Sequence, residues 1–170
     1  MSLESTISIL EGVLGDKRWS AGLTAEVVRE ELDKLPKEVW NSNTRFLDKT
    51  CLNGIYLFGV FEKLIECEDV KRKFPDMKER FDHIWGNQLF GIAPDPAVCI
   101  IAERVLFKCI NGKHTNNMQY ISNYVALLKN KDNKTINKII KRKFGIGKFD
   151  VVFHRYNAQQ IEEWLHDIGR

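Results

Sequence analysis

The chain has 170 residues, of which 44% are hydrophobic, and a formal net charge of +3. This length fits one domain or two small lobes, and the hydrophobic fraction is ample for a core. No apolar run approaches the roughly 20 residues that a membrane span needs, and the N-terminus lacks a basic start before a long apolar stretch. We therefore expect no membrane partner and no secretory signal.

The modest net charge hides an asymmetry between the two halves of the chain. Residues 1–100 carry 13 Lys and Arg against 17 Asp and Glu, whereas residues 101–170 carry 13 against 6. A strongly basic half indicates an anionic partner, most often nucleic acid. We expect a single domain over residues 1–170, possibly built as an acidic N-terminal lobe (1–92) and a basic C-terminal lobe (97–170).

The four cysteines and four histidines form no metal-binding or redox pattern. The cysteines lie in apolar surroundings with no C-x-x-C pair, and the histidines show no H-x-x-x-H spacing. Such usage is typical of reduced, buried thiols in a cytoplasmic protein. We expect no metal and no cofactor.

Hydrophobic residues recur at helical spacing along most of the chain. Residues 3–14 predict a first helix, and Thr24 is a suitable N-cap for a second helix that continues to Leu35. Pro36 can begin a third helix that extends to Leu47. Residues 54–65 are almost wholly apolar, so they predict either a buried helix or a pair of strands.

The second half of the chain continues the helical pattern. Residues 69–85 predict a charged helix that Pro75 interrupts. Further helices are predicted over residues 97–109, 117–129, 134–144 and 157–169. The predicted fold is therefore mainly α, a multi-helix globular domain with at most a short β element at 55–61 or 149–154.

The densest positive charge lies in residues 129–148, which hold eight Lys and Arg and one acid, Asp132. If residues 134–144 form a helix, Ile136, Ile139, Ile140 and Phe144 make an apolar stripe. The cations then point away from that stripe with no acid at i±4 to offset them, which weakens a helix that lacks a polyanion. Because the charge is mostly lysine, the pattern favours phosphate contact over reading of base edges. The candidate nucleic-acid-binding residues are Lys134, Lys138, Lys141, Arg142, Lys143, Lys148 and Arg155.

Residues 135–156 resemble a helix-turn-helix DNA-binding motif. Phe144, Gly145 and Ile146 would form its turn, since glycine adopts the left-handed conformation without a Cβ penalty. The resemblance implies a recognition helix over Lys148–Tyr156, on which Arg155 would contact bases or a groove. A strand remains the alternative, because FDVVF is β-branched and aromatic. The basic helix would then lie beside a sheet edge, and phosphate contact would still be possible.

A fainter resemblance to winged-helix domains covers residues 23–58. It implies a second helix at Thr24–Leu35 and a third near Asn43–Cys51. The alternative is a capped turn between two core helices, and the acidic charge of this half weighs against DNA contact there.

The sequence holds no motif that identifies a catalytic centre. It has no G-x-x-x-x-G-K-[ST] loop, no G-x-S-x-G and no strand-borne set of two acids and a lysine. We assign no catalytic residue and leave the question of enzyme activity open, with a preference against it. The expected function is a DNA-binding or other nucleic-acid-binding domain, as a regulator or recognition module. The alternatives are a helical domain that docks an acidic protein, and a nuclease or other nucleic-acid-processing enzyme or its subunit.

Overall fold

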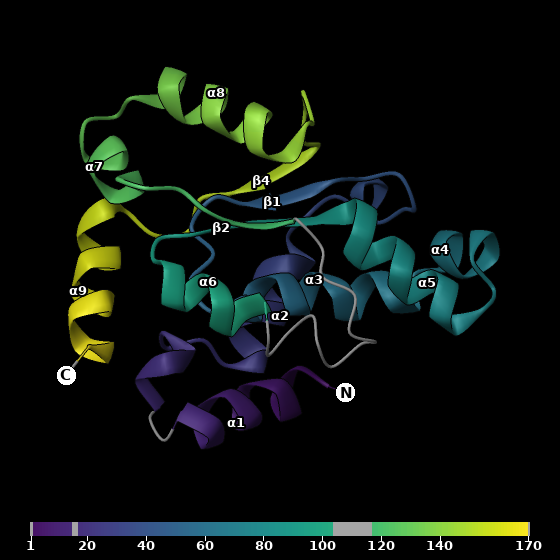
Figure 1. Cartoon of the computed structure of the whole chain (residues 1–170). Coiled ribbons are helices and arrows are strands. Elements are labelled where there is room, and N and C mark those ends of the chain that lie inside the picture. The colour runs from purple at the N-terminus through teal and green to yellow at the C-terminus, as the bar shows by residue number, and fades with distance from the viewer. Residues whose placement is uncertain (1, 15–16, 104–116, 170) are drawn as a thin grey trace.

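A small parallel sheet lies at the centre of the molecule, with helices on both of its faces (Figure 1). The computed structural model describes residues 2–14, 17–103 and 117–169. The strands are β1 (Phe46–Asp48), β2 (Leu89–Ala93), β3 (Met118–Tyr120) and β4 (Val151–Phe153). The helices are α1 (Leu3–Leu14), α2 (Ala25–Asp33), α3 (Ile55–Glu66), α4 (Glu68–Lys73), α5 (Met77–His83), α6 (Pro96–Ala102), α7 (Tyr124–Lys129), α8 (Asn133–Phe144) and α9 (Ala158–Ile168), with shorter helical turns η1 (Lys17–Ser20), η2 (Lys37–Val39) and η3 (Ile84–Gln88).

The order of the strands, within the described residues, is β3-β2-β1-β4, and every pair is parallel. Phe46 of β1 pairs with Leu89 of β2 on one side and with Val151 of β4 on the other. The chain thus adds β2 and β3 in one direction from β1 and then returns to add β4 on the opposite side. This is the order of the first four strands of a doubly wound α/β sheet. The sheet draws strands from both the acidic and the basic half of the chain.

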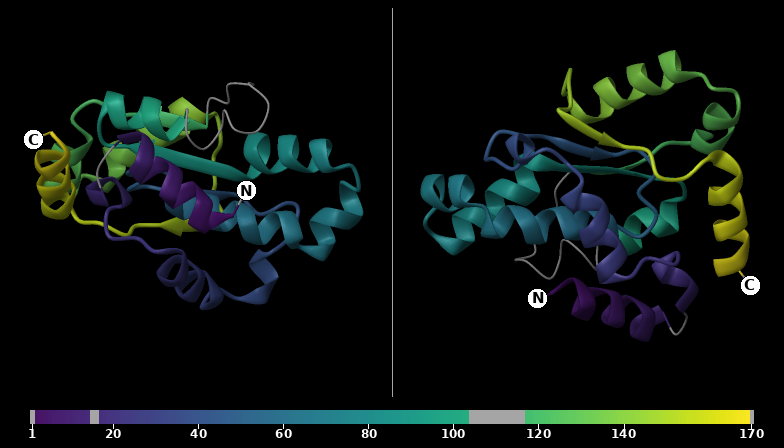
Figure 2. Two further views of the ribbon diagram at one scale, coloured as in Figure 1. Left: turned by 90° about the horizontal axis from the view of Figure 1, so that it is seen from below. Right: turned by 180° about the vertical axis from the view of Figure 1, so that it is seen from behind.

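The reversal of direction also explains which helices cover which face. Crossovers between parallel strands are right-handed, so strands added in opposite directions have their connecting helices on opposite faces. Helices α3 and α6 lie on one face together with α1 and α2, and α7 and α8 lie on the other (Figures 1 and 2). The molecule is therefore layered, with α8 on the outside.

The larger core lies under the face that carries α3. Phe46, Leu89 and Phe153 turn toward it and are at most 8% exposed. Nine of the twelve residues of α3 are buried, so the apolar run at 54–65 is a helix and not a strand pair. The Cα of Gly59 faces α2 so closely that a Cβ there would stand 2.4 Å from Cγ1 of Val28.

The prediction of a mainly helical chain is confirmed, but the sheet is larger than the one short β element that we expected. The strand alternative at 149–154 is confirmed as β4, and the other candidate, 55–61, lies within α3. The remaining strands were missed because β1 and β3 have only three residues. β1 and β2 are also buried throughout, so they lack the alternation that marks a half-exposed strand.

The second helix that a helix-turn-helix needs at Lys148–Tyr156 is absent, because Val151–Phe153 is β4. Gly145 does adopt the left-handed conformation, with φ of 67°, but it ends α8 before a loop that returns to the sheet. β-branched Val151 and Val152 pair with β1 there, and tertiary pairing decides the conformation. Likewise, β1 occupies part of the region near Asn43–Cys51 where a winged helix would place its third helix.

Several helix ends lie where the sequence places them. The side chains of Thr24 and Asn157 accept hydrogen bonds from Val27 and Gln160, and Asn157 and Gln160 form a capping box. Pro75 separates α4 from α5. The predicted helix over 97–109 is seen as α6, and its residues beyond 103 lie outside the described ones. In the described ranges no helix has the length and apolarity needed to cross a membrane.

Candidate functional site

Helix α8, which carries most of the predicted binding residues, is locally well specified at both ends. The Asp132 carboxylate accepts a hydrogen bond from the Thr135 N–H at 3.0 Å, which caps the first turn. The side chain and then the backbone of Thr135 hold the pKa of Asp132 below its usual value by hydrogen bonding to the carboxylate. Gly145 closes the last turn, where its N–H donates to the Lys141 carbonyl at 3.0 Å. The helix therefore begins and ends for local reasons and does not depend on a ligand.

The inner face of α8 holds the helix on the sheet. Ile136 and Ile140 are at most 5% exposed and pack with Leu47 of β1 and Phe90 of β2. Below the end of α8, the rings of Phe90, Phe144 and Phe149 meet edge to face, with centroids 5.2–5.8 Å apart. The aromatic residues near α8 thus serve its packing.

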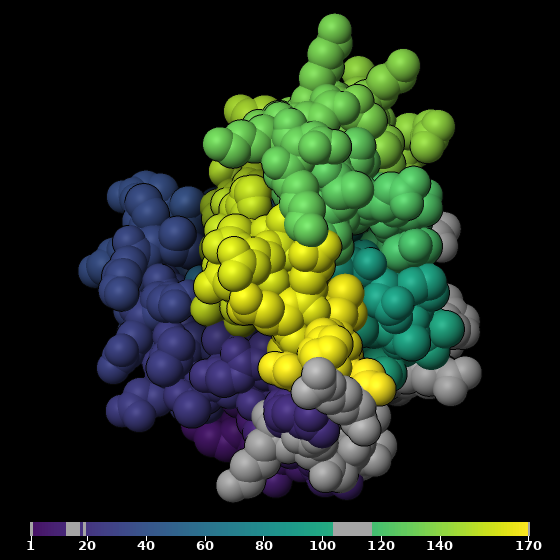
Figure 3. All heavy atoms as spheres, turned by 90° about the vertical axis from the view of Figure 1, so that its left-hand side faces the viewer, coloured from purple at the N-terminus to yellow at the C-terminus, as the bar shows by residue number. Residues whose placement is uncertain are grey.

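The outer face of α8 carries four exposed cations: Lys134, Lys138, Lys141 and Arg142. We call these four residues the cationic face. None of them forms an ion pair with any residue in the described ranges, whereas Lys129 of α7 pairs with Glu162 at 2.7 Å and Lys78 of α5 pairs with Asp82 at 2.9 Å. In Figure 3, side chains of the α7–α8 segment project from the top of the molecule. The cationic face is therefore open to a partner.

The other three predicted residues lie outside the cationic face. Lys148 is exposed in the loop between α8 and β4. Lys143 is also exposed, but its Nζ donates to Oε1 of Gln119 in β3 at 3.4 Å, so it points toward the sheet. Arg155 does not belong to the cationic face, because its side chain is only 14% exposed and contacts α2 and α3. Its assignment to a groove contact depended on the recognition helix that the structure lacks.

A second site lies at the carboxyl ends of β1 and β4, where the strand order reverses; we call it the switch-point crevice. It is lined by Leu23, Asp48, Thr50, Leu52, Asn53, Gly54, Tyr56, Arg155 and Tyr156. In doubly wound sheets ligands bind at this position, outside the carboxyl ends of the strands. Here the lining residues leave a cavity of about 10 Å³, which is room for about one water molecule.

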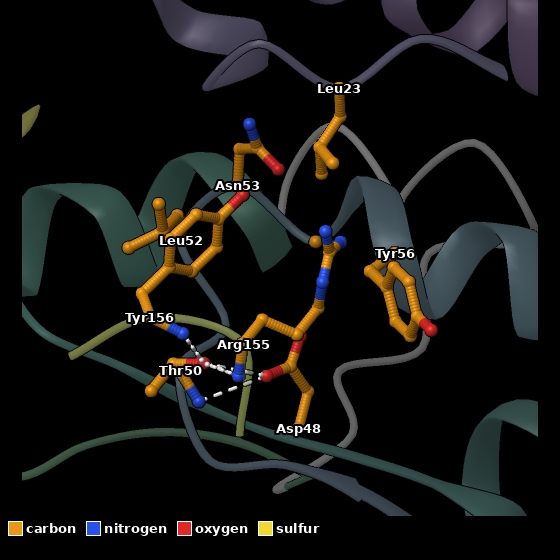
Figure 4. Close-up of a pocket in the computed structure, with 9 residues that line it drawn as sticks. Leu23, Asp48, Thr50, Leu52, Asn53, Tyr56, Arg155 and Tyr156 are labelled. Atoms are coloured by element: carbon orange, nitrogen blue, oxygen red, sulfur yellow. Dashed lines mark hydrogen bonds between the residues drawn. The ribbon is translucent and has the colours of Figure 1, made fainter. Parts of the chain in front are cut away.

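Thr50 and Asp48 hold the floor of the crevice together. The Asp48 carboxylate accepts a hydrogen bond from the Thr50 N–H at 2.9 Å, and the Thr50 hydroxyl accepts from the backbone N–H of Arg155 at 3.0 Å (Figure 4). Asp48 is only 3% exposed, and burial raises its pKa to about 6, although the nearby Arg155 favours the charged form. The carboxyl group of Asp48 is thus buried from solvent at the end of β1.

Sequence reasoning missed the crevice because it did not identify β1. Its signal is an aspartate directly after the apolar pair Phe46–Leu47, followed by Asn53–Gly54 at the start of a helix. Gly54 adopts φ of 80° before α3, and the Asn53 side chain accepts from the Ile55 N–H at 3.0 Å. A strand, a tight turn and a helix in this order predict a ligand-binding edge once the strand is known.

In the described part of the chain, no three His, Cys, Asp or Glu side chains gather closely enough to hold a metal ion. No protein-family model, curated protein or solved structure matches the chain.

Proposed function

We propose that the protein is a nucleic-acid-binding domain whose cationic face contacts the phosphate backbone. The observation that carries this proposal is a row of four exposed cations on one helix, none of which forms an ion pair among the described residues. Lys134, Lys138 and Lys141 repel one another at helical spacing, which costs stability in the free protein. A polyanion removes that repulsion and gains the entropy of released counterions.

The predominance of lysine favours contact with the phosphate backbone over recognition of base edges. Three of the four residues are lysines, which contact phosphate as point charges, whereas arginine forks suit guanine edges. Lys134 and Lys141 are seven residues apart, which is about 10 Å along a helix. Such a face suits several neighbouring phosphates and gives affinity with little dependence on sequence.

The surface near the cationic face supports a double helix as the partner. Single-strand binders stack bases on exposed aromatic side chains. Phe144 at the end of α8 and Phe149 after it pack against Phe90, and no Phe, Tyr or Trp side chain whose burial the structure describes belongs to the exposed class. An outward-facing helix without a stacking platform fits the regular phosphates of a duplex better than splayed bases.

The test is fluorescence anisotropy with a 20-base-pair duplex and with a single strand of equal length, at about 50 to 200 mM salt. We expect tighter binding to the duplex and an affinity that falls by about 10²-fold over this range, since four contacts give a slope near −3.6. Lys138→Glu with Lys141→Glu should weaken binding at least tenfold. The matched control, Lys34→Glu with Lys37→Glu, reverses two exposed charges on the opposite layer and should change affinity less than twofold.

If the parent protein binds neither the duplex nor the single strand at 50 mM salt, the proposal is wrong. If the two double variants lose nucleic-acid affinity to the same extent, α8 is not the binding surface. If the α8 variant instead loses a nuclease-resistant acidic protein partner, the cationic face serves protein docking.

A further inference from the structure

The guanidinium group of Arg155 fills the switch-point crevice. The Arg155 side chain leaves the segment after β4 and passes between the rings of Tyr156 and Tyr56, with Asp48 at its base and Leu23 beyond its tip (Figure 4). The small cavity beside it shows that the guanidinium group takes most of the available space. The position where a doubly wound sheet normally accepts a ligand is thus occupied by the protein itself.

The contacts of Arg155 are those of a bound planar cation. Its Cζ lies 4.2 Å from the centroid of the Tyr56 ring and 5.5 Å from that of Tyr156. Its Nη2 lies 3.3 Å from both carboxylate oxygens of Glu31 on α2. Two aromatic rings and an acid around a flat cation are the usual features of a guanidinium site.

The fit is nevertheless incomplete. Nη1 of Arg155 is buried and has no hydrogen-bond partner in the described residues. A buried donor without a protein partner is costly to desolvate, and the small cavity beside it has room for about one water molecule. The Asp48 carboxylate beside it accepts from Thr50 and lies deep in the crevice without a direct hydrogen bond to the guanidinium among those described. Arg155 thus occupies a site whose acidic groups it only partly uses.

We propose that the switch-point crevice is a binding site for a guanidinium group, which Arg155 occupies as an internal plug and which a guanidino compound can occupy when Arg155 is withdrawn. Glu31 holds the plug from α2, and Tyr56, Tyr156 and Asp48 form the walls and floor. The site is separate from the cationic face, so it stands or falls independently of nucleic-acid binding. The guanidinium group has two possible sources, a free small molecule and the arginine of a peptide.

The experiment removes the Arg155 side chain and then adds a small guanidinium ligand. Arg155→Ala, Arg155→Lys and the parent protein are titrated calorimetrically with methylguanidinium at constant ionic strength, with methylammonium as the charge-matched ligand. We expect saturable binding of methylguanidinium to Arg155→Ala, at least fivefold tighter than that of methylammonium. The parent and Arg155→Lys, whose crevices stay filled, should bind at least tenfold more weakly. Adding Tyr56→Leu to Arg155→Ala should weaken binding at least fivefold, because the ring face is lost.

A folded Arg155→Ala variant that shows no saturable binding overturns the proposal, as does equal binding of methylammonium. A blocked arginine dipeptide tests the source: binding as tight as that of methylguanidinium shows that the site accepts a peptide arginine, and exclusion of the dipeptide shows a site for free guanidino compounds. If Arg155→Ala does not fold, Glu31→Gln is the alternative variant. It removes the ion pair that holds Arg155 but keeps the Arg155 side chain. Methylguanidinium should then shift the amide resonances of Thr50 and Tyr56 at a lower concentration in Glu31→Gln than in the parent, and identical titrations overturn the proposal.

Discussion

Lys49 donates a hydrogen bond from its Nζ to Oδ1 of Asn137 at 3.1 Å, joining the residue after β1 to the middle of α8. Lys49 is half-buried, and this burial lowers its pKa. Its ammonium group is therefore held at the exposed flank of α8, by Asn137, and does not belong to the four residues of the cationic face. We expect Lys49→Met to reduce the free energy of unfolding by about 0.5–1 kcal/mol through the lost hydrogen bond. Urea unfolding measures this change. The slope of duplex affinity against salt should stay the same, and a decrease of about one would show that Lys49 also contacts phosphate.

Asp48 should make stability depend on pH in an unusual direction. Its pKa is about 6 in the folded protein, against 3.8 as its usual value, because burial disfavours the charged form. Between these two values the folded protein holds a proton that the unfolded chain has lost, so this group stabilises the fold as the pH falls from 6 toward 4. At pH 7.5 the buried charge costs about 2–3 kcal/mol.

Asp48→Asn should therefore increase the free energy of unfolding at pH 7.5 by about 1–3 kcal/mol, because the amide still accepts from Thr50 and carries no charge. The advantage over the parent should shrink as the pH approaches 4. Thermal and urea unfolding across pH 4–8 measure the difference, with the exposed Glu26→Gln as control. A stability of Asp48→Asn below that of the parent at pH 7.5, where the parent carboxyl is charged, would mean that the charge itself holds Arg155 in place.

Two helical glycines should respond in opposite ways to alanine. Gly12 of α1 has no atom within 4 Å of a Cβ built on it, so Gly12→Ala should stabilise by about 0.5–1 kcal/mol through helix propensity. At Gly59 of α3 the new Cβ would stand 2.4 Å from Val28 and 3.1 Å from Leu32. There we expect a net loss of about 1–3 kcal/mol, because overpacking exceeds the propensity gain. A stabilised Gly59→Ala in urea unfolding would show that α2 and α3 can separate freely.

Arg80 is a buried cation that serves the ends of two helices. It is 7% exposed and donates to the carbonyl oxygens of Ile65, Phe74 and Pro75 at 3.0–3.3 Å. Arg80→Met keeps much of the volume but leaves these acceptors without their donor, so we expect a loss of about 2–3 kcal/mol. Arg72→Met is the control, since Arg72 is 78% exposed in its ion pair with Asp69. Equal stability of the two variants in urea would refute a structural role for Arg80.

Helices whose ends carry local signals could be predicted from the sequence, and elements decided by distant pairing could not. Thr24, Gly145 and Asn157 mark helix ends through their own side chains or backbone, and the structure places the ends there. β1 has only three residues, and its position depends on β2 and β4, which lie far away in the chain. The apolar stretch Phe46–Leu47 therefore fitted the helical pattern of its neighbours.

The candidate site shows the same division. The cationic face follows from helical spacing alone, so Lys134, Lys138, Lys141 and Arg142 could be placed on one surface from the sequence. Arg155 could not, because its surroundings come from α2 and α3, more than 90 residues earlier. The crevice needs the strand order to be known, and no local pattern carries that order.

The pairing of β1 with β4 has a consequence for how the chain folds. Asp48 and Phe153 lie side by side in the sheet although 105 residues separate them. During synthesis β1 can pair with β2 early, but its other edge stays open until Phe153 has been made. Such distant parallel pairings form slowly, and an open strand edge can associate with other chains. Completion of the sheet should therefore be the late step of folding, and α8, which precedes β4, should be in place before it.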